Sequence, residues 1–218
     1  MTTNNQINAN IDSSPFLLPR SGSLKWIAPA IENMTGLKSL HKHYLARPSN
    51  ADTESFLTHT LDALGISYKT HKLDRNNIPE SGPLLIVANH PLGGVEGVIL
   101  AKILLAYRSD LLVMANHFLK RIPELSSLFI GVDVFEGKEA MKANLKAIKQ
   151  AHKHLENQGA LLIFPAGEVS TYDNDTNQLQ DKEWNRLVGK LAQKHKANCL
   201  PIFIGGKNSK SFYLAGRL

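Results

Sequence analysis

The strongest constraint on the fold is a repeated alternation of short apolar runs with longer amphipathic segments from residue 84 onward. Short apolar runs bounded by glycine or proline are typical of buried strands, and longer amphipathic segments are typical of helices. The predicted strands cover 84–88, 111–115, 132–135, 160–164 and 199–204, and the predicted helices cover 95–107, 123–129, 138–157 and 182–196. This order predicts an α/β fold with a mostly parallel central sheet flanked by helices.

The first 47 residues differ from the rest of the chain. Residues 1–14 are polar and lack the charged start and continuous apolar core of a secretory signal, so we predict a disordered leader there. Residues 15–47 predict an N-terminal amphipathic helical segment, as one helix or as two helices broken near Gly36. This segment either packs against the folded domain or lies on a membrane surface with Trp26 at the headgroups, and both interpretations can hold together.

The α/β domain is predicted to span 48–218. Before the alternation begins, a helix is predicted from Asp52 or Thr53 to Leu64, and an edge-type strand over 66–73. The chain ends soon after the last predicted strand, so we expect this domain to be incomplete at its C-terminus.

Composition limits the classes of function. The 218 residues carry a formal net charge of +6, which suits nucleic acid, anionic lipid or an acidic carrier protein as a partner. Aromatic residues make up only 7%, no basic stripe is interleaved with them and no zinc-ligand spacing occurs, so neither nucleic acid nor a metal is predicted. The longest apolar stretch, 98–107, is interrupted by Lys102, whereas a spanning helix needs about 20 apolar residues. The single cysteine, Cys199, excludes an intrachain disulfide and is predicted to be buried as a small hydrophobe.

Chemically useful residues follow the first predicted strand of the alternation. The sequence there reads NHPLGGVEG and contains Asn89, His90, Gly93, Gly94 and Glu96. A strand of an open α/β sheet delivers the residues after it to the carboxyl edge, where such folds hold their ligands. An imidazole with a carboxylate close by is the minimum equipment for general-base chemistry, so His90 and Glu96 are the leading catalytic candidates.

A second polar loop, FPAGEVS, follows the predicted strand over 160–164 and contains Pro165, Gly167 and Glu168. Successive parallel strands end at the same edge of a sheet, so we expect Glu168 and His90 to line one crevice. The alternative interpretation is a proline-glycine turn with a solvent-exposed glutamate.

The blocks NHPLGGVEG, FPAGEVS and LPIFIGG, in this order, resemble those of the glycerolipid (lysophospholipid) acyltransferases, the family of 1-acylglycerol-3-phosphate acyltransferases. The likeness covers about residues 78–206. It implies transfer of a fatty acyl group from a thioester, on acyl carrier protein or coenzyme A, to a hydroxyl of a lysolipid, with no bound cofactor.

The resemblance also implies roles for individual residues. His90 would remove the hydroxyl proton, and Glu96 would orient the imidazole and stabilise its cation. Backbone N–H groups near Gly93, Gly94 or Gly167 would hold the developing oxyanion. The remaining substrate-binding candidates are Asn89, Pro165, Glu168 and Lys138.

Several residues depart from the family pattern. Val95 stands where the family has aspartate, and the acid here is Glu96, so we expect the Gly93-Gly94 pair to absorb the extra residue. The alternative is that Glu96 is only a favourable acid in the first turn of a helix. Gly137 and Val169 stand at the positions of two family arginines. Arginine is the side chain best suited to bind phosphate, and both arginines are absent here, although Lys138 could supply a point charge. We therefore expect an acceptor without a phosphomonoester.

This variant of the motifs resembles the bacterial haemolysin-like branch associated with ornithine lipid synthesis. The resemblance implies O-acylation of lyso-ornithine lipid or another phosphate-free acceptor, by a cytoplasmic protein bound peripherally to the inner face of the cytoplasmic membrane. Two other classes remain open: a catalytically inactive lipid- or carrier-binding module, and a hydrolase, which the absence of a Gly-x-Ser-x-Gly elbow disfavours. The lysines of the predicted helix 138–157 indicate either a solvated face or a docking surface for an anionic carrier or membrane.

Overall fold

The computed structural model describes residues 15–18, 24–71, 77–133, 138–173, 175–209 and 212–213. The chain forms two compact units, residues 1–66 and residues 67–218. This division differs from the sequence-based boundary at 47/48, because the helix that starts at Thr53 belongs to the first unit. The leader predicted over 1–14 lies outside the described residues.

Within its described residues, the first unit contains the helices α2 (Leu24–Thr35), α3 (Leu37–Leu45) and α4 (Thr53–Ala63). Gly36 has a φ of 79°, a left-handed conformation that ends α2 and starts α3, so two helices replace one at the predicted position. The Tyr44 ring packs edge-on against the Phe16 ring and the Phe56 ring, with centroids 5.5 and 6.0 Å away. These aromatic contacts give the unit a small core of its own.

The second unit is built on a five-stranded sheet in the order β3-β2-β4-β1-β7, and all its strand pairs are parallel. The strands are β1 (Leu84–Ala88), β2 (Leu112–Asn116), β3 (Phe129–Val132), β4 (Ala160–Ile163) and β7 (Asn198–Ile202). The main helices are α6 (Gly94–Leu105), α7 (Lys138–Glu156) and α8 (Leu187–His195). The prediction of an α/β fold with a parallel central sheet is therefore confirmed.

The core of this unit lies on both faces of the sheet. Leu85 and Val87 of β1 and Leu161 of β4 belong to a buried cluster that includes residues of α7 and α8. The alternate residues Leu84 and Ile86 point to the other face and are equally buried. Every residue of β1 is buried, so the strand is anchored in the core up to Ala88, the residue that precedes Asn89 and His90. Among the described residues, no helix is both long and apolar enough to cross a bilayer.

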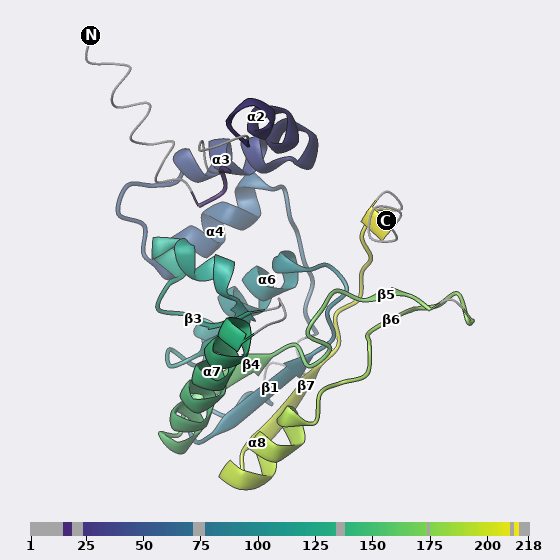
Figure 1. Cartoon of the computed structure of the whole chain (residues 1–218). Coiled ribbons are helices and arrows are strands. Elements are labelled where there is room, and N and C mark those ends of the chain that lie inside the picture. Colours follow the sequence, from purple (N-terminus) through teal and green to yellow (C-terminus); the bar gives the residue numbers. More distant parts are fainter. Residues whose placement is uncertain are drawn as a thin grey trace. The chain divides into compact units, whose positions relative to one another are not determined.

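Three parts of the second unit differ from prediction. In place of the helix predicted near 123–129, there is a single short 3₁₀ helix, η2 (Pro123–Leu125), which follows another, η1 (His117–Arg121), and β3 already begins at Phe129. A small hairpin of β5 (Thr171–Tyr172) and β6 (Leu179–Gln180), which was not predicted, follows the FPAGEVS segment and extends away from the sheet (Figure 1). The strand predicted over 66–73 is wrong for residues 66–71, which form no strand, because alternation alone supplies no partner strand.

The prediction that Cys199 is buried is also wrong. Cys199 lies on β7, the edge strand of the sheet, and is exposed. The apolar residues next to Cys199 in the sequence resemble those of the central strands. An edge strand, however, pairs with another strand on one side only.

Helix α7 buries alanines and its last leucine rather than all its larger apolar residues. Its buried residues are Ala140, Ala147, Ala151 and Leu155, whereas Met141 and Leu145 are 60% and 55% exposed. The predicted strand over 132–135 begins earlier, and its last two residues fall outside the described residues.

Candidate active site

His90 lies just beyond the carboxyl end of β1. Its side chain is 18% exposed, so the ring reaches the surface without standing free in solvent. The ring lies 4.5 Å, centroid to centroid, from the ring of Phe164, which follows β4. Because β1 and β4 are parallel neighbours, the loops that follow them meet at one edge of the sheet.

Glu96 approaches His90 from the first turn of α6. Its side chain is fully buried, and Oε1 lies 2.8 Å from Nδ1 of His90. The same oxygen accepts a hydrogen bond of 3.0 Å from the backbone N–H of Leu92. The intervening Gly93 has φ 84° and ψ −129°, a backbone conformation that residues other than glycine avoid. The glycine thus lets the chain turn sharply enough to bring a helical carboxylate back to the imidazole.

The contact between His90 and Glu96 is close without being a well-aligned hydrogen bond. Among the described residues, neither Nδ1 of His90 nor Oε2 of Glu96, both buried, has an aligned partner. Buried polar atoms left in this state are uncommon and are concentrated at functional sites. Since Nδ1 faces the carboxylate, Nε2 is the ring nitrogen left to meet a substrate.

The loop after β4 packs directly on the His90 loop. The backbone N–H of Ser170 donates a hydrogen bond of 2.8 Å to the carbonyl of His90. A Cβ placed on Gly93 would lie 3.4 Å from Cγ2 of Val169, so the Val169 side chain lies close to this glycine. The structure therefore brings together two segments that lie far apart in the sequence.

Glu168 takes a different direction from the rest of its loop. Its Oε1 lies 2.6 Å from Nζ of Lys182, and both side chains are exposed. Among the described residues, no hydrogen bond or ion pair joins this carboxylate to His90, and the bond between the two loops runs from Ser170 to the His90 carbonyl instead.

The remaining residues that the sequence predicted for the site lie in four different environments. The N–H of Gly167 donates 3.0 Å to the Phe164 carbonyl, so it is engaged within its own turn. Pro165 is buried, and its carbonyl accepts from the N–H of Asn185 at 3.0 Å. Gly94 begins α6, and Lys138 is an exposed residue at the start of α7.

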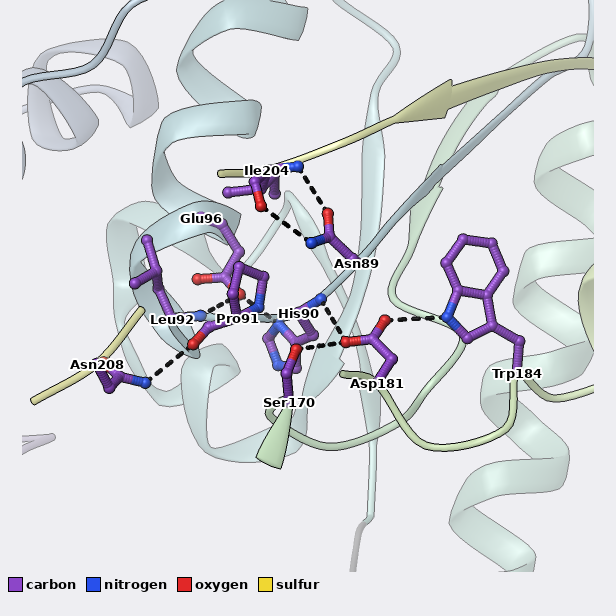
Figure 2. Close-up of polar contacts among 10 residues, drawn as sticks. All are labelled: Asn89, His90, Pro91, Leu92, Glu96, Ser170, Asp181, Trp184, Ile204 and Asn208. Atoms are coloured by element: carbon purple, nitrogen blue, oxygen red, sulfur yellow. Dashed lines mark hydrogen bonds and ion pairs between the residues drawn. The ribbon is translucent and has the colours of Figure 1, made fainter. Parts of the chain in front are cut away.

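Asn89 uses its side-chain amide to hold the backbone. Its Nδ2 donates to the carbonyl of Ile204 at 3.0 Å, and its Oδ1 accepts from the N–H of Ile204 at 2.7 Å. Asn208 donates from Nδ2 to the carbonyl of Pro91 at 3.0 Å. Figure 2 shows the contacts of Asn89 with Ile204 above His90 and the contact of Asn208 with Pro91 to its left. The segment after β7 therefore steadies the chain on either side of His90.

Sequence reasoning missed Asp181. Its Oδ1 accepts from the N–H of His90 at 3.1 Å and from Oγ of Ser170 at 2.5 Å, and its Oδ2 accepts from Nε1 of Trp184 at 2.9 Å (Figure 2). Asp181 follows a loop rich in Asp and Asn, where no local pattern distinguishes one acid from another. Only the fold, which brings residue 181 to residue 90, reveals it.

Comparisons with known proteins found similar families, sequences and structures. A family model described as "Acyltransferase" matches residues 20–218. A lyso-glycine lipid O-acyltransferase of Bacteroides thetaiotaomicron is 27% identical over 169 residues, which are 72% of this chain and 60% of that protein. A lyso-glycine lipid O-acyltransferase of Phocaeicola vulgatus is 29% identical over 139 residues, 63% of this chain and 47% of that protein. The chain thus spans less than two thirds of the length of either relative.

Among solved structures, the chain is similar to the 1-acyl-sn-glycerophosphate (LPA) acyltransferase PlsC of Thermotoga maritima. The match has a TM-score of 0.47 and 17% identity, and it covers 90% of this chain and 74% of that one.

Proposed function

Because this chain belongs to the acyltransferase family, we propose that it moves a fatty acyl group from a thioester to the hydroxyl group of a lysolipid. One observation supports this most: a buried carboxylate, that of Glu96, lies 2.8 Å from Nδ1 of a partly exposed histidine. This arrangement supplies a general base whose other nitrogen faces outward.

In the proposed reaction, Nε2 of His90 takes the proton of the acceptor hydroxyl while that oxygen attacks the thioester carbonyl carbon. Glu96 stabilises the imidazolium that forms and keeps the ring oriented. The new C–O ester bond forms, the C–S bond breaks, and the proton passes from His90 to the departing thiolate. No covalent intermediate with the protein is needed.

The developing oxyanion needs hydrogen-bond donors near His90. The first N–H groups of a helix have no partners within that helix, and they carry its partial positive charge. In α6 these groups lie near Gly93 and Gly94, next to the proposed base. They are better candidates than the N–H of Gly167, which already donates to Phe164.

The proposed acceptor is lyso-ornithine lipid or another phosphate-free lysolipid, and a lyso-glycine lipid is of this second kind. The names of the two curated relatives support an amino-acid lipid. Val169 supports it too, since an apolar side chain against the His90 loop offers a phosphomonoester no counter-charge.

The proposed donor is acyl carrier protein or acyl-coenzyme A, both of which are anionic. The exposed side of α7 supports this, because it carries lysines beside the uncovered Met141 and Leu145. These lysines are Lys138, Lys142, Lys146, Lys149 and Lys153.

The chain is further proposed to work at the inner face of the cytoplasmic membrane, as a peripheral protein. In the first unit, Trp26 is 85% exposed and Ile27 and Leu45 are more than half exposed. An exposed tryptophan beside apolar residues on a short helix is typical of side chains that enter the headgroup region.

The test is a matrix of acyl transfer assays with the purified protein. Acyl carrier protein and coenzyme A thioesters are each offered with lyso-ornithine lipid, lyso-glycine lipid and lysophosphatidic acid. We expect ester formation with an amino-acid lysolipid and only a small residual rate in His90→Ala, while His117→Ala, which removes an exposed histidine of η1, remains active. Binding of lysolipid without turnover by the parent protein would instead identify an inactive binding module, and preference for lysophosphatidic acid would contradict the proposed acceptor.

A further inference from the structure

The backbone of His90 is held at both its polar groups. Its carbonyl accepts from the N–H of Ser170, and its N–H donates to Oδ1 of Asp181. A histidine just beyond a strand would otherwise be free to change its backbone angles, and each change would move the ring relative to Glu96. The two bonds come from the loop after β4 and from Asp181, the residue that directly follows β6.

Asp181 is the residue common to these contacts. One oxygen accepts from both His90 and Ser170, and the other accepts from Nε1 of Trp184, three residues later (Figure 2). Ser170 is buried, with 3% of its surface exposed, and its own N–H holds the His90 carbonyl. Asp181 therefore closes a ring of hydrogen bonds in which His90, Ser170 and Asp181 each touch the other two.

We propose that Asp181 is a positioning residue for the acyl transfer reaction, acting by fixing the backbone of His90 against the loop that carries Ser170. This inference rests on the proposed function of His90 as the base. The proposed role of Asp181 is to hold other groups in place, since its oxygens accept hydrogen bonds from His90, Ser170 and Trp184. Trp184 in turn fixes the carboxylate by donating to its second oxygen.

The proposal predicts that the loss of Asp181 lowers kcat and leaves KM nearly unchanged. A base displaced by about 1 Å loses on the order of a hundredfold in rate, while substrate contacts made elsewhere are unchanged. We expect Asp181→Ala to lower kcat by about tenfold to a hundredfold with KM within about twofold of the parent. Asp173→Ala is the matched control, because Asp173 accepts hydrogen bonds from Thr176 within the same hairpin and, among the described residues, forms no hydrogen bond with His90, Ser170 or Asp181.

A pair of milder variants tests the geometry without removing the side chain. Asp181→Asn keeps an oxygen for His90 and Ser170 but turns an NH₂ group toward Nε1 of Trp184, so two donors face each other. Trp184→Phe removes that conflict. We expect Asp181→Asn to lose activity several-fold, Trp184→Phe to lose little, and the double variant to return to within about threefold of Trp184→Phe.

Hydrogen exchange separates this inference from the proposed function. We expect amide exchange in the peptide that contains residues 89–92 to accelerate in Asp181→Ala and to be unchanged in Asp173→Ala. Unchanged exchange in Asp181→Ala, or a kcat within twofold of the parent, would overturn the proposal, as would a loss confined to KM. A parent protein inactive with every donor and acceptor would refute the proposed function, and the exchange result would still decide whether Asp181 holds the His90 backbone.

Discussion

Replacing Glu96 with glutamine tests the electrostatic part of the site. The glutamine has nearly the same shape, and its oxygen can still accept from the N–H of Leu92, as Oε1 of Glu96 does at 3.0 Å. What the variant loses is the negative charge beside Nδ1 of His90. The change therefore removes a charge from a fully buried position while leaving the local hydrogen bond in place.

The size of the effect follows from the separation of the two groups. The closest atoms are 2.8 Å apart, so the charge centres of an imidazolium and this carboxylate lie roughly 4 Å apart. At an effective dielectric constant of about 20, that pair is worth about 4 kcal/mol in the charged state. Because about 1.4 kcal/mol corresponds to tenfold in rate, kcat should fall by about a thousandfold, and at least by about a hundredfold.

The assay is acyl transfer under saturating donor and acceptor, with the melting temperature followed in parallel. Glu168→Gln is the matched control, because it neutralises a carboxylate on the adjoining loop that is exposed and paired with Lys182. We expect the control to retain most of the parent activity. A Glu96→Gln enzyme with more than a tenth of the parent kcat would refute the electrostatic reasoning.

Three further outcomes are expected. Gly93→Ala should cost about 1–3 kcal/mol in urea unfolding and slow the reaction, because alanine is strained at φ 84°; equal stability would contradict the role of this turn. Arg108→Met should destabilise the protein by about 3 kcal/mol or more in the same assay, since buried Arg108 donates to the carbonyls of Pro79, Gly82 and Gln158; a loss under 1 kcal/mol would argue against it. Burial, and next the charge of Lys194, lower the pKa of His152 in the folded protein. The unfolded chain therefore takes up a proton at a higher pH than the folded protein does, and stability falls as the pH drops below about 6.5. His152→Gln should reduce that fall in melting temperatures compared at pH 7.5 and 5.5, and an unaltered pH dependence would contradict the assignment.

The central sheet could be predicted from the sequence because its signal is local. Each strand of the sheet is a short apolar run, and the parallel order follows from the helices between most of them. Gly36 and Asp52 marked helix ends correctly, since their chemistry acts within one turn: Gly36 is left-handed, and Asp52 accepts from the N–H of Ser55 at 2.8 Å. The strand proposed over 66–73 depended on a partner strand that the sequence could not supply.

Part of the candidate site could also be predicted from local sequence, and part could not. His90 and Glu96 are six residues apart, so the glycine between them was enough to suggest that they meet. Asp181 is 91 residues from His90, and only the parallel pairing of β1 with β4 brings its loop to the site. The direction of Glu168 depended on the position of Lys182, which the sequence left open. Cys199 was misjudged because the sequence does not reveal which strand lies at the edge.

The most direct test of the account is a double variant that combines His90→Ala with Glu96→Gln. If Glu96 acts through His90, the residues work as one unit, and their effects are not additive. We expect the double variant to transfer acyl groups at the same residual rate as His90→Ala alone. A double variant slower than His90→Ala by the full factor that Glu96→Gln costs the parent enzyme would contradict the claim that the two side chains form one catalytic pair.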